Sequence, residues 1–230
     1  MWPGRWRLRR VGCLAALVLV LTSCTGGDDG VNTTTPRETV PLPEPRPHSE
    51  TSLEEVLEAR RSVRQYTSQR LTDVEISQLL WAAQGTTRGG RGRTAPSAGG
   101  LYPLEVYVVT ADGVFHYDPA QHGLSMVAGE DLREPLSRVA LDQEAVRDAP
   151  AVFGVTAVVA RTASKYGDRA TRYVHLEAGH AAQSLLLQAV ALGLGGVPIG
   201  AFDDDGVQRV LGLTQGEEPV YLIPIGHPAE

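Results

Sequence analysis

The stretch Ala95-Pro96-Ser97-Ala98-Gly99-Gly100-Leu101-Tyr102-Pro103 decides how this chain is interpreted, together with Arg60-Arg61-Ser62-Val63-Arg64-Gln65-Tyr66. The first stretch is a loop of small residues, which lets backbone amides approach a flat ligand closely. The second stretch places three guanidinium groups and a hydroxyl within five positions, a combination suited to a phosphate. One ligand that needs both a phosphate clamp and a close fit around a planar ring is flavin mononucleotide, FMN.

The N-terminus has the pattern of an export signal. Arginines precede an apolar run, Leu14 to Leu21, which is too short to span a bilayer. The run ends in Leu21-Thr22-Ser23-Cys24, which resembles the lipobox of bacterial lipoproteins, so we expect cleavage of residues 1–23 and lipidation of Cys24. A lipid-anchored protein on the extracytoplasmic face of the cell membrane is the result. Arg9-Arg10 also resembles a twin-arginine signal, which leaves the export route open.

The mature chain is acidic and has one domain. Residues 24–50 form a proline-rich segment that we expect to be a disordered tether, and residues 51–230 are long enough for one core. Both cysteines, Cys13 and Cys24, lie outside this domain, which therefore has no disulfide and no thiolate nucleophile. Loss of residues 1–23 changes the formal charge from −6 to −10 and makes nucleic acid an unlikely partner.

Hydrophobic periodicity predicts a mixture of helices and strands, an α+β fold. Ser52 and Thr72, each followed three residues later by Glu, predict the N-termini of two helices. Further helices are expected at 131–139, 172–192 and 203–211. Strands are expected at 104–110, 114–117, 151–160 and 220–225.

These motifs together resemble the FMN-dependent nitroreductase family, and within it most closely the branch of azoline dehydrogenases. The resemblance also rests on Glu177-Ala178-Gly179-His180-Ala181-Ala182-Gln183, on Gly193-Leu194-Gly195 and on Pro224-Ile225-Gly226-His227-Pro228. It covers the chain from about Leu53 to the C-terminus. It implies a nitroreductase-like fold, in which helices flank a central, mostly antiparallel sheet, and an intertwined homodimer with FMN at the subunit interface.

The resemblance also assigns site residues. Those implied to hold the phosphate and ribityl end of FMN are Arg60, Arg61, Ser62 and Arg64. Those implied to lie along or around the flavin ring are Pro96, Ser97, Ala98, Gly99, Gln183, Ser184, Gly193, Leu194 and Gly195. Two positions depart from the family pattern: Ser184 stands where Asn is frequent, and His227 stands where a basic phosphate contact is usual.

Lys165 and Tyr166 form a second constellation. The chain has 21 basic residues, and Lys165 is the only lysine among them. A lysine can lose its proton when it is desolvated, whereas an arginine cannot. A Lys-Tyr pair at this place is the catalytic pair of the azoline dehydrogenase branch, which implies that Lys165 and Tyr166 move a proton while hydride passes to the flavin.

Three functions stay open at this point. The first is dehydrogenation of a small heterocyclic or peptide-derived substrate, and the second is reduction of nitro compounds or quinones with NAD(P)H as electron donor. The third is a flavin- or ligand-binding lipoprotein without activity. A metal site is not expected, because His175, Glu177 and His180 cannot converge from one helix, and Asp203–Asp205 suits a helix N-terminus.

Overall fold

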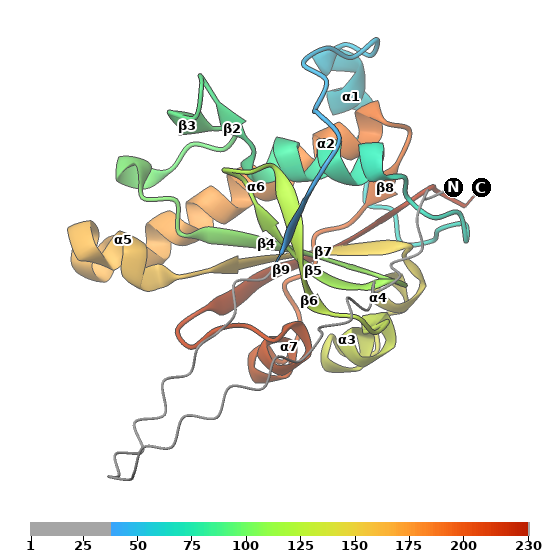
Figure 1. The fold of residues 1–230 in the computed structure, drawn as a ribbon. Helices are drawn as coiled ribbons and strands as arrows, with labels where there is room; N and C mark the ends of the chain where they lie inside the picture. The colour runs from blue at the N-terminus through green and yellow to red at the C-terminus, as the bar shows by residue number, and fades with distance from the viewer. Residues whose placement is uncertain (1–37, 230) are drawn as a thin grey trace, which may run out of the picture. The chain divides into compact units, whose positions relative to one another are not determined.

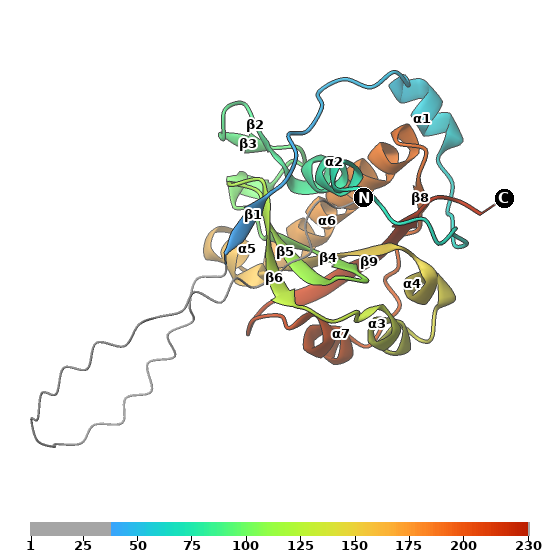
Figure 2. The same cartoon turned by 45° about the vertical axis from the view of Figure 1, so that its right-hand side comes forward.

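The structure is a computed structural model that describes residues 38–229 (Figures 1 and 2). The predicted signal peptide, Cys24 and residues 24–37 of the predicted tether lie outside the described residues. Within the described part of the chain, no helix is long and apolar enough to cross a membrane.

The centre of the fold is a seven-stranded sheet with the order β1-β6-β5-β4-β7-β9-β8, in which each neighbouring pair is antiparallel. Its strands are β1 (Thr39–Pro41), β4 (Leu104–Thr110), β5 (Gly113–Asp118), β6 (Gly123–Ala128), β7 (Ala151–Ala157), β8 (Gly195–Gly196) and β9 (Glu218–Gly226). A separate two-stranded ribbon consists of β2 (Thr86–Thr87) and β3 (Gly92–Arg93). The predicted central antiparallel sheet is thus confirmed.

Helices cover both faces of the sheet (Figure 1). On one face α2 (Asp73–Gln84) and α6 (Ala170–Ala191) pack against the side chains of Val106 and Val108. On the other face α3 (Arg133–Val139), α4 (Glu144–Asp148) and α7 (Asp204–Leu211) pack against Tyr107 and Val109. Because both faces are covered, β7 is buried at all its residues and reads in the sequence as a continuous apolar run.

The remaining helices are α1 (Leu53–Ala59) and α5 (Val159–Tyr166), with short 3-10 turns at Ala98–Gly100 and Gly167–Arg169. The predicted capping boxes are present, since Ser52 caps α1 and Thr72 caps α2, each reciprocally with the Glu three residues later. The predicted helix at 172–192 is observed as α6, and the predicted helix at 203–211 as α7.

Residues 38–50 lie in the predicted tether, and the structure shows part of this segment in contact with the domain. Their proline-rich composition offers little apolar surface, but the backbone of this segment is held by hydrogen bonds. Strand β1 pairs with β6 at the edge of the sheet, where a proline is tolerated. Beyond it, Ser77 Oγ donates to the carbonyl of Pro43, and the Arg46 amide donates to Gln78 Oε1 at 2.8 Å.

Other elements also differ from the sequence prediction. Strand β7 ends at Ala157, and the apolar run continues into helix α5, which the periodicity did not separate from the strand. Helix α3 begins at Arg133, because Asp131 accepts hydrogen bonds from the amide and the guanidinium of Arg133 and does not cap the helix. Strand β6 was not predicted, since it is short and includes Ser125.

Candidate functional site

The loop at 95–103, which joins β3 to β4, turns its small residues toward solvent. Gly99 and Gly100 both have φ of +65°, a conformation that side chains with a Cβ rarely adopt. The Tyr102 amide donates to Ser97 Oγ at 2.9 Å, which closes the loop on itself. Pro96 and Gly99 are exposed, and Ser97 and Ala98 are half-buried, so a flat ligand can reach the backbone here.

Lys165 and Tyr166 lie directly against this loop. They are the last two residues of α5, and a Cβ placed on Gly99 would be 3.0 Å from Tyr166 Oη and 3.2 Å from Lys165 Nζ. The Tyr166 ring is held edge-on against Tyr173 of α6, with ring centroids 4.9 Å apart. The structure therefore brings together the small-residue loop and the Lys-Tyr pair, which are more than 60 positions apart in the sequence.

Arg161 fastens α5 to the start of β4. Its guanidinium donates to the carbonyl of Tyr102 at 3.1 Å and pairs with Glu105 at 2.5 Å. Glu105 in turn contacts His116 Nε2 at 2.7 Å. Although burial acts to raise it, the hydrogen bonds from His116 and Arg161 hold the pKa of Glu105 below its ordinary value. The carboxylate thus stays charged, and it anchors the helix that carries Lys165.

Residues 60–64, which follow α1 and are called the arginine segment here, lie at another part of the fold, against the turn that follows α6. The Val63 amide donates to the Gly196 carbonyl at 3.0 Å. A Cβ on Gly195 would be 2.6 Å from Val63, so this contact requires glycine. Gly193 is exposed with φ of +72°, whereas Leu194 and Gly195 are buried. The predicted phosphate residues and the predicted Gly193–Gly195 turn are thus neighbours.

The guanidiniums of this segment are free to bind an anion. Among the described residues, Arg60, Arg61 and Arg64 make no side-chain hydrogen bond or ion pair. Arg61, Ser62 and Arg64 are exposed, and Arg60 is half-buried. Three unpaired guanidiniums beside a hydroxyl fit a phosphate monoester, because such groups donate several hydrogen bonds and carry the opposite charge.

The two groups of residues lie at opposite ends of α6 (Figure 1). Ser97 lies near Glu177, in the first half of the helix, and acts on the pKa of its carboxyl. The arginine segment meets the turn after Ala191. At 1.5 Å per residue these positions are roughly 20 Å apart along the helix axis. Gln183, which is exposed, and Ser184, which is half-buried, lie between them. One chain therefore does not place the loop and the arginine segment side by side.

Glu177 lies beside the candidate site, although the sequence analysis named it only within a family motif and among residues that cannot converge on a metal ion. Its side chain is buried, and Oε1 has no hydrogen-bond partner among the described residues. Burial raises the pKa of Glu177 to about 7, while a hydrogen bond from Ser97 and the charge of Arg93 act in the opposite direction. A glutamate within the buried stripe of α6, beside Val174, Ala178 and Ala181, was the available signal in the sequence.

His227 does not add a free cation to the arginine segment. Its Nε2 is 3.8 Å from Glu75 Oε1 on α2, so the imidazole faces a carboxylate. The candidate phosphate-binding residues are thus those of the arginine segment, and His227 does not provide the free basic contact that the resemblance implies at this position.

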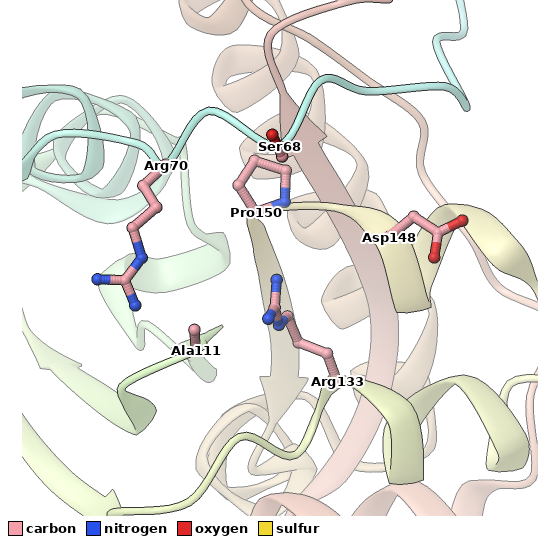
Figure 3. Close-up of a pocket in the computed structure, with 6 residues that line it drawn as sticks. All are labelled: Ser68, Arg70, Ala111, Arg133, Asp148 and Pro150. Atoms are coloured by element: carbon pink, nitrogen blue, oxygen red, sulfur yellow. The ribbon is translucent and has the colours of Figure 1, made fainter.

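A pocket of about 220 Å³ lies elsewhere, beside the β4–β5 turn and the start of β7, and contains none of the predicted site residues (Figure 3). Two arginines, Arg70 and Arg133, line it. Both are already neutralised, since Arg70 pairs with Asp112 at 3.0 Å and Arg133 with Asp131 at 2.6 Å. This pocket therefore lacks the free positive charge that distinguishes the arginine segment.

No group of three or more His, Cys, Asp and Glu side chains within residues 38–229 is arranged to hold a metal ion. His175 and His180 are exposed on α6, whereas Glu177 between them is buried, so the three residues point in different directions.

Comparison with known proteins agrees with this architecture. Residues 57–227 match the model of the nitroreductase family. A protein of Methanocaldococcus jannaschii, provisionally named nitroreductase MJ1384, is 43% identical over 187 residues, which are 79% of this chain and 93% of that protein.

Solved structures show the same fold. A provisionally named nitroreductase of Ralstonia eutropha JMP134 has a TM-score of 0.74 at 30% identity, over 84% of this chain and 90% of that one. The NADPH:FMN oxidoreductase of Vibrio harveyi, solved in complex with NAD+, has a TM-score of 0.59 at 24% identity, over 77% of this chain and 69% of that one; at this identity the likeness concerns the fold alone. From the family match, the relative and the shared fold we conclude that this chain is an oxidoreductase and belongs to the nitroreductase family.

Proposed function

We propose that this protein is an FMN-dependent oxidoreductase whose own proton-transfer pair is Lys165 and Tyr166. The observation that carries the proposal is the position of both side chains against Gly99, 3.2 and 3.0 Å from where a Cβ would stand. A ring that lies along the Pro96–Gly99 backbone would have a basic and a phenolic group at its edge.

The residues present fit FMN at both of its ends. The unpaired Arg60, Arg61 and Arg64, with Ser62, suit the phosphate. The exposed Gly99–Gly100 backbone suits the ring, because neither residue carries a side chain of its own and a Cβ on Gly100 would meet nothing within 4 Å. When bound, FMN would supply the acceptor or donor of a hydride, a reaction that no side chain performs.

We also propose that the active molecule is a homodimer. The loop and the arginine segment of one chain are separated by most of the length of α6, so one FMN requires the loop of one copy and the arginine segment of another. A two-fold arrangement satisfies this requirement twice and gives two equal sites. Leu57 on α1 and Leu176 on α6, 51% and 53% exposed, offer apolar surface to a second copy.

The substrate class we propose is a small heterocycle or a peptide-derived ring that loses two hydrogens. One would leave a ring carbon as hydride to FMN, and the other would leave as a proton to Lys165, the proposed base. Tyr166 Oη, beside Lys165 at the same loop, can donate a hydrogen bond to a heteroatom of the ring or pass the proton onward. The substrate is thereby oxidised and the cofactor reduced by two electrons.

Replacement of Lys165 tests this assignment. We expect Lys165→Ala and Lys165→Arg to retain FMN and to lose turnover at least a hundredfold, since an arginine keeps the charge but cannot act as a base at neutral pH. Arg169, exposed in the 3-10 turn after α5, provides a matched control as Arg169→Ala. Full activity of Lys165→Ala would exclude a lysine base.

A second candidate is reduction of nitro compounds or quinones with NAD(P)H. The 43% identity to a protein that carries a nitroreductase name favours it. Anaerobic mixing of the FMN-loaded protein with NADPH, and separately with NADH, distinguishes the two functions through the visible flavin band. Rapid bleaching would establish the reductase, whereas a persistent band would favour the dehydrogenase.

We propose, finally, that the protein is attached to the outer face of the cell membrane through a lipidated Cys24. The lipobox-like Leu21-Thr22-Ser23-Cys24 supports this proposal. Metabolic labelling with a palmitate analogue in a bacterial host tests it, with Cys24→Ala as the unlabelled control and Cys13→Ala as the labelled one. Equal labelling of the wild type and Cys24→Ala would exclude it.

A further inference from the structure

Glu177 differs from the other buried glutamate of the described chain. Glu217 is 3% exposed and accepts hydrogen bonds from Tyr107, Thr156 and Thr214. Glu177 is 2% exposed, and one of its carboxyl oxygens has no partner in residues 38–229. A buried carboxylate in this position is destabilised relative to the neutral acid, because neither water nor a full set of donors compensates the charge.

This carboxyl lies behind the loop that we assign to the flavin ring. Ser97 links the two, since its hydroxyl accepts a hydrogen bond from the Tyr102 amide and also lies close enough to the Glu177 carboxyl to act on its pKa. One turn earlier on α6 is Tyr173, whose ring supports Tyr166. The loop is thus in contact with Glu177 through Ser97 and with the Lys-Tyr pair through Gly99.

The charges around Glu177 come from few elements. Arg93 of β3 is the cation that acts on Glu177, but it forms no ion pair with it and is engaged elsewhere, over the Tyr102 ring at 4.8 Å and with Gln84 Oε1 at 2.9 Å. Helix α2 contributes the uncharged amide of Gln84. Helix α5 contributes Tyr166 through Tyr173, and on β4 Glu105 is occupied by His116 and Arg161.

We propose that Glu177 takes up a proton when FMN covers the loop, so that the cofactor and the proton bind together. A flat ligand on the loop removes the remaining water near Ser97 and further disfavours the charged carboxylate. Glu177 is in this view a positioning residue: in its neutral form it allows Ser97 and the loop to pack closely against the ring. The inference rests on the proposed binding of FMN.

Burial already places the pKa of Glu177 at about 7 in the free protein, so the carboxyl is partly charged at neutral pH and has a proton to gain. Linkage then requires FMN to bind more weakly as the pH rises above 7, with a limit of tenfold per pH unit for one proton. The FMN phosphate titrates near pH 6 and therefore also makes FMN affinity depend on pH in the lower range. This contribution is the same for the wild type and for Glu177→Gln, so it cancels when the two are compared.

The experiment is calorimetric titration of the full-length apoprotein with FMN at pH 7.5, in two buffers of different ionisation enthalpy. The difference between the two heats gives the number of protons taken up. We expect a clear fraction of one proton for the wild type, none for Glu177→Gln, and the wild-type value for Glu217→Gln, whose buried carboxyl contacts the opposite face of the sheet.

Each result has a separate meaning. Absence of proton uptake by the wild type overturns the inference without any variant, and equal uptake by Glu177→Gln overturns it as well. If the wild type binds no FMN in either buffer, the proposed function itself fails. A supporting readout is FMN affinity between pH 7 and 9, which we expect to fall about tenfold or more for the wild type and to stay constant for Glu177→Gln.

Discussion

Gly99 shows how one absent side chain creates the candidate site. Its positive φ excludes most residues, and the space above it is occupied by Tyr166 Oη and Lys165 Nζ. Gly100 has the same φ but nothing within 4 Å of a Cβ. Substitutions at Gly99 and at Gly100 therefore distinguish the effect of backbone strain, which both share, from the effect of contact with Lys165 and Tyr166, which only Gly99 has.

Gly99→Ala and Gly100→Ala should both lower the free energy of unfolding by about 1 kcal/mol, because both impose a Cβ on left-handed backbone. Only Gly99→Ala should in addition displace the Lys-Tyr pair and reduce turnover at least tenfold. Thermal denaturation and steady-state kinetics of the two variants measure this difference. Equal losses of turnover would mean that loop strain alone matters.

Glu177 makes stability depend on pH in a direction opposite to that of a salt-bridged acid. Its folded pKa of about 7 lies above the ordinary value of 4.5, so the folded state binds the proton more tightly than the unfolded chain. The stabilisation is fully present below pH 4.5 and is lost as the pH rises through 7, to a total of about 3 kcal/mol.

Denaturant unfolding of the apoprotein between pH 5 and 8 measures this dependence. We expect the free energy of unfolding of the wild type to decline relative to that of Glu177→Gln over this interval. Parallel pH profiles for the two proteins would show that Glu177 keeps an ordinary pKa. The comparison with Glu177→Gln cancels the titration of the histidines, which both proteins share.

At the scale of elements, α5 is short, and Arg161 is one of the residues that hold it beside the loop. Helix α5 has eight residues, too few to be stable alone, so its position depends on tertiary contacts. Arg161 provides two of these, to Tyr102 and to Glu105. The pair is partly exposed, so its contribution to stability is small, about 1 kcal/mol or less.

Arg161→Ala should therefore leave the melting temperature almost unchanged and still reduce turnover severalfold, because Lys165 is no longer held against Gly99. FMN affinity, which depends on other residues, should change little. Arg209→Ala, which removes a more exposed ion pair with Asp203 on α7, is the control and should retain full activity. A variant of Arg161 with normal kinetics would show that packing against α6 alone positions α5.

At the scale of the whole molecule, the length of α6 decides how the site is completed. The helix has 22 residues and separates the loop from the arginine segment. In the proposed site, a single copy would contribute either the ring-binding loop or the phosphate-binding residues to one FMN. The proposed FMN site therefore requires the proposed dimer, and we expect oligomeric state and FMN content to change together.

Leu57→Glu and Leu176→Glu should weaken a dimer about tenfold or more each, since a buried leucine contributes roughly 1.5–3 kcal/mol, and should lower FMN occupancy in parallel. Leu141, 67% exposed after α3 on the opposite face, is the control as Leu141→Glu. Analytical ultracentrifugation with absorbance at the flavin band reports both quantities. A wild-type monomer with full FMN content would contradict the shared site.

The sequence by itself determined the elements that local rules govern. The capping boxes at Ser52 and Thr72, the buried strand that begins at Ala151 and the small-residue loop follow from nearest neighbours and periodicity. Only the tertiary structure decided the rest, because it depends on contacts between distant residues. These include the pairing of β1 with β6, the placement of Lys165 and Tyr166 over Gly99, and the burial of Glu177 behind Ser97. The distance between the arginine segment and the loop also depends on the tertiary structure. It is determined by the direction and length of α6, and no sequence motif predicts it.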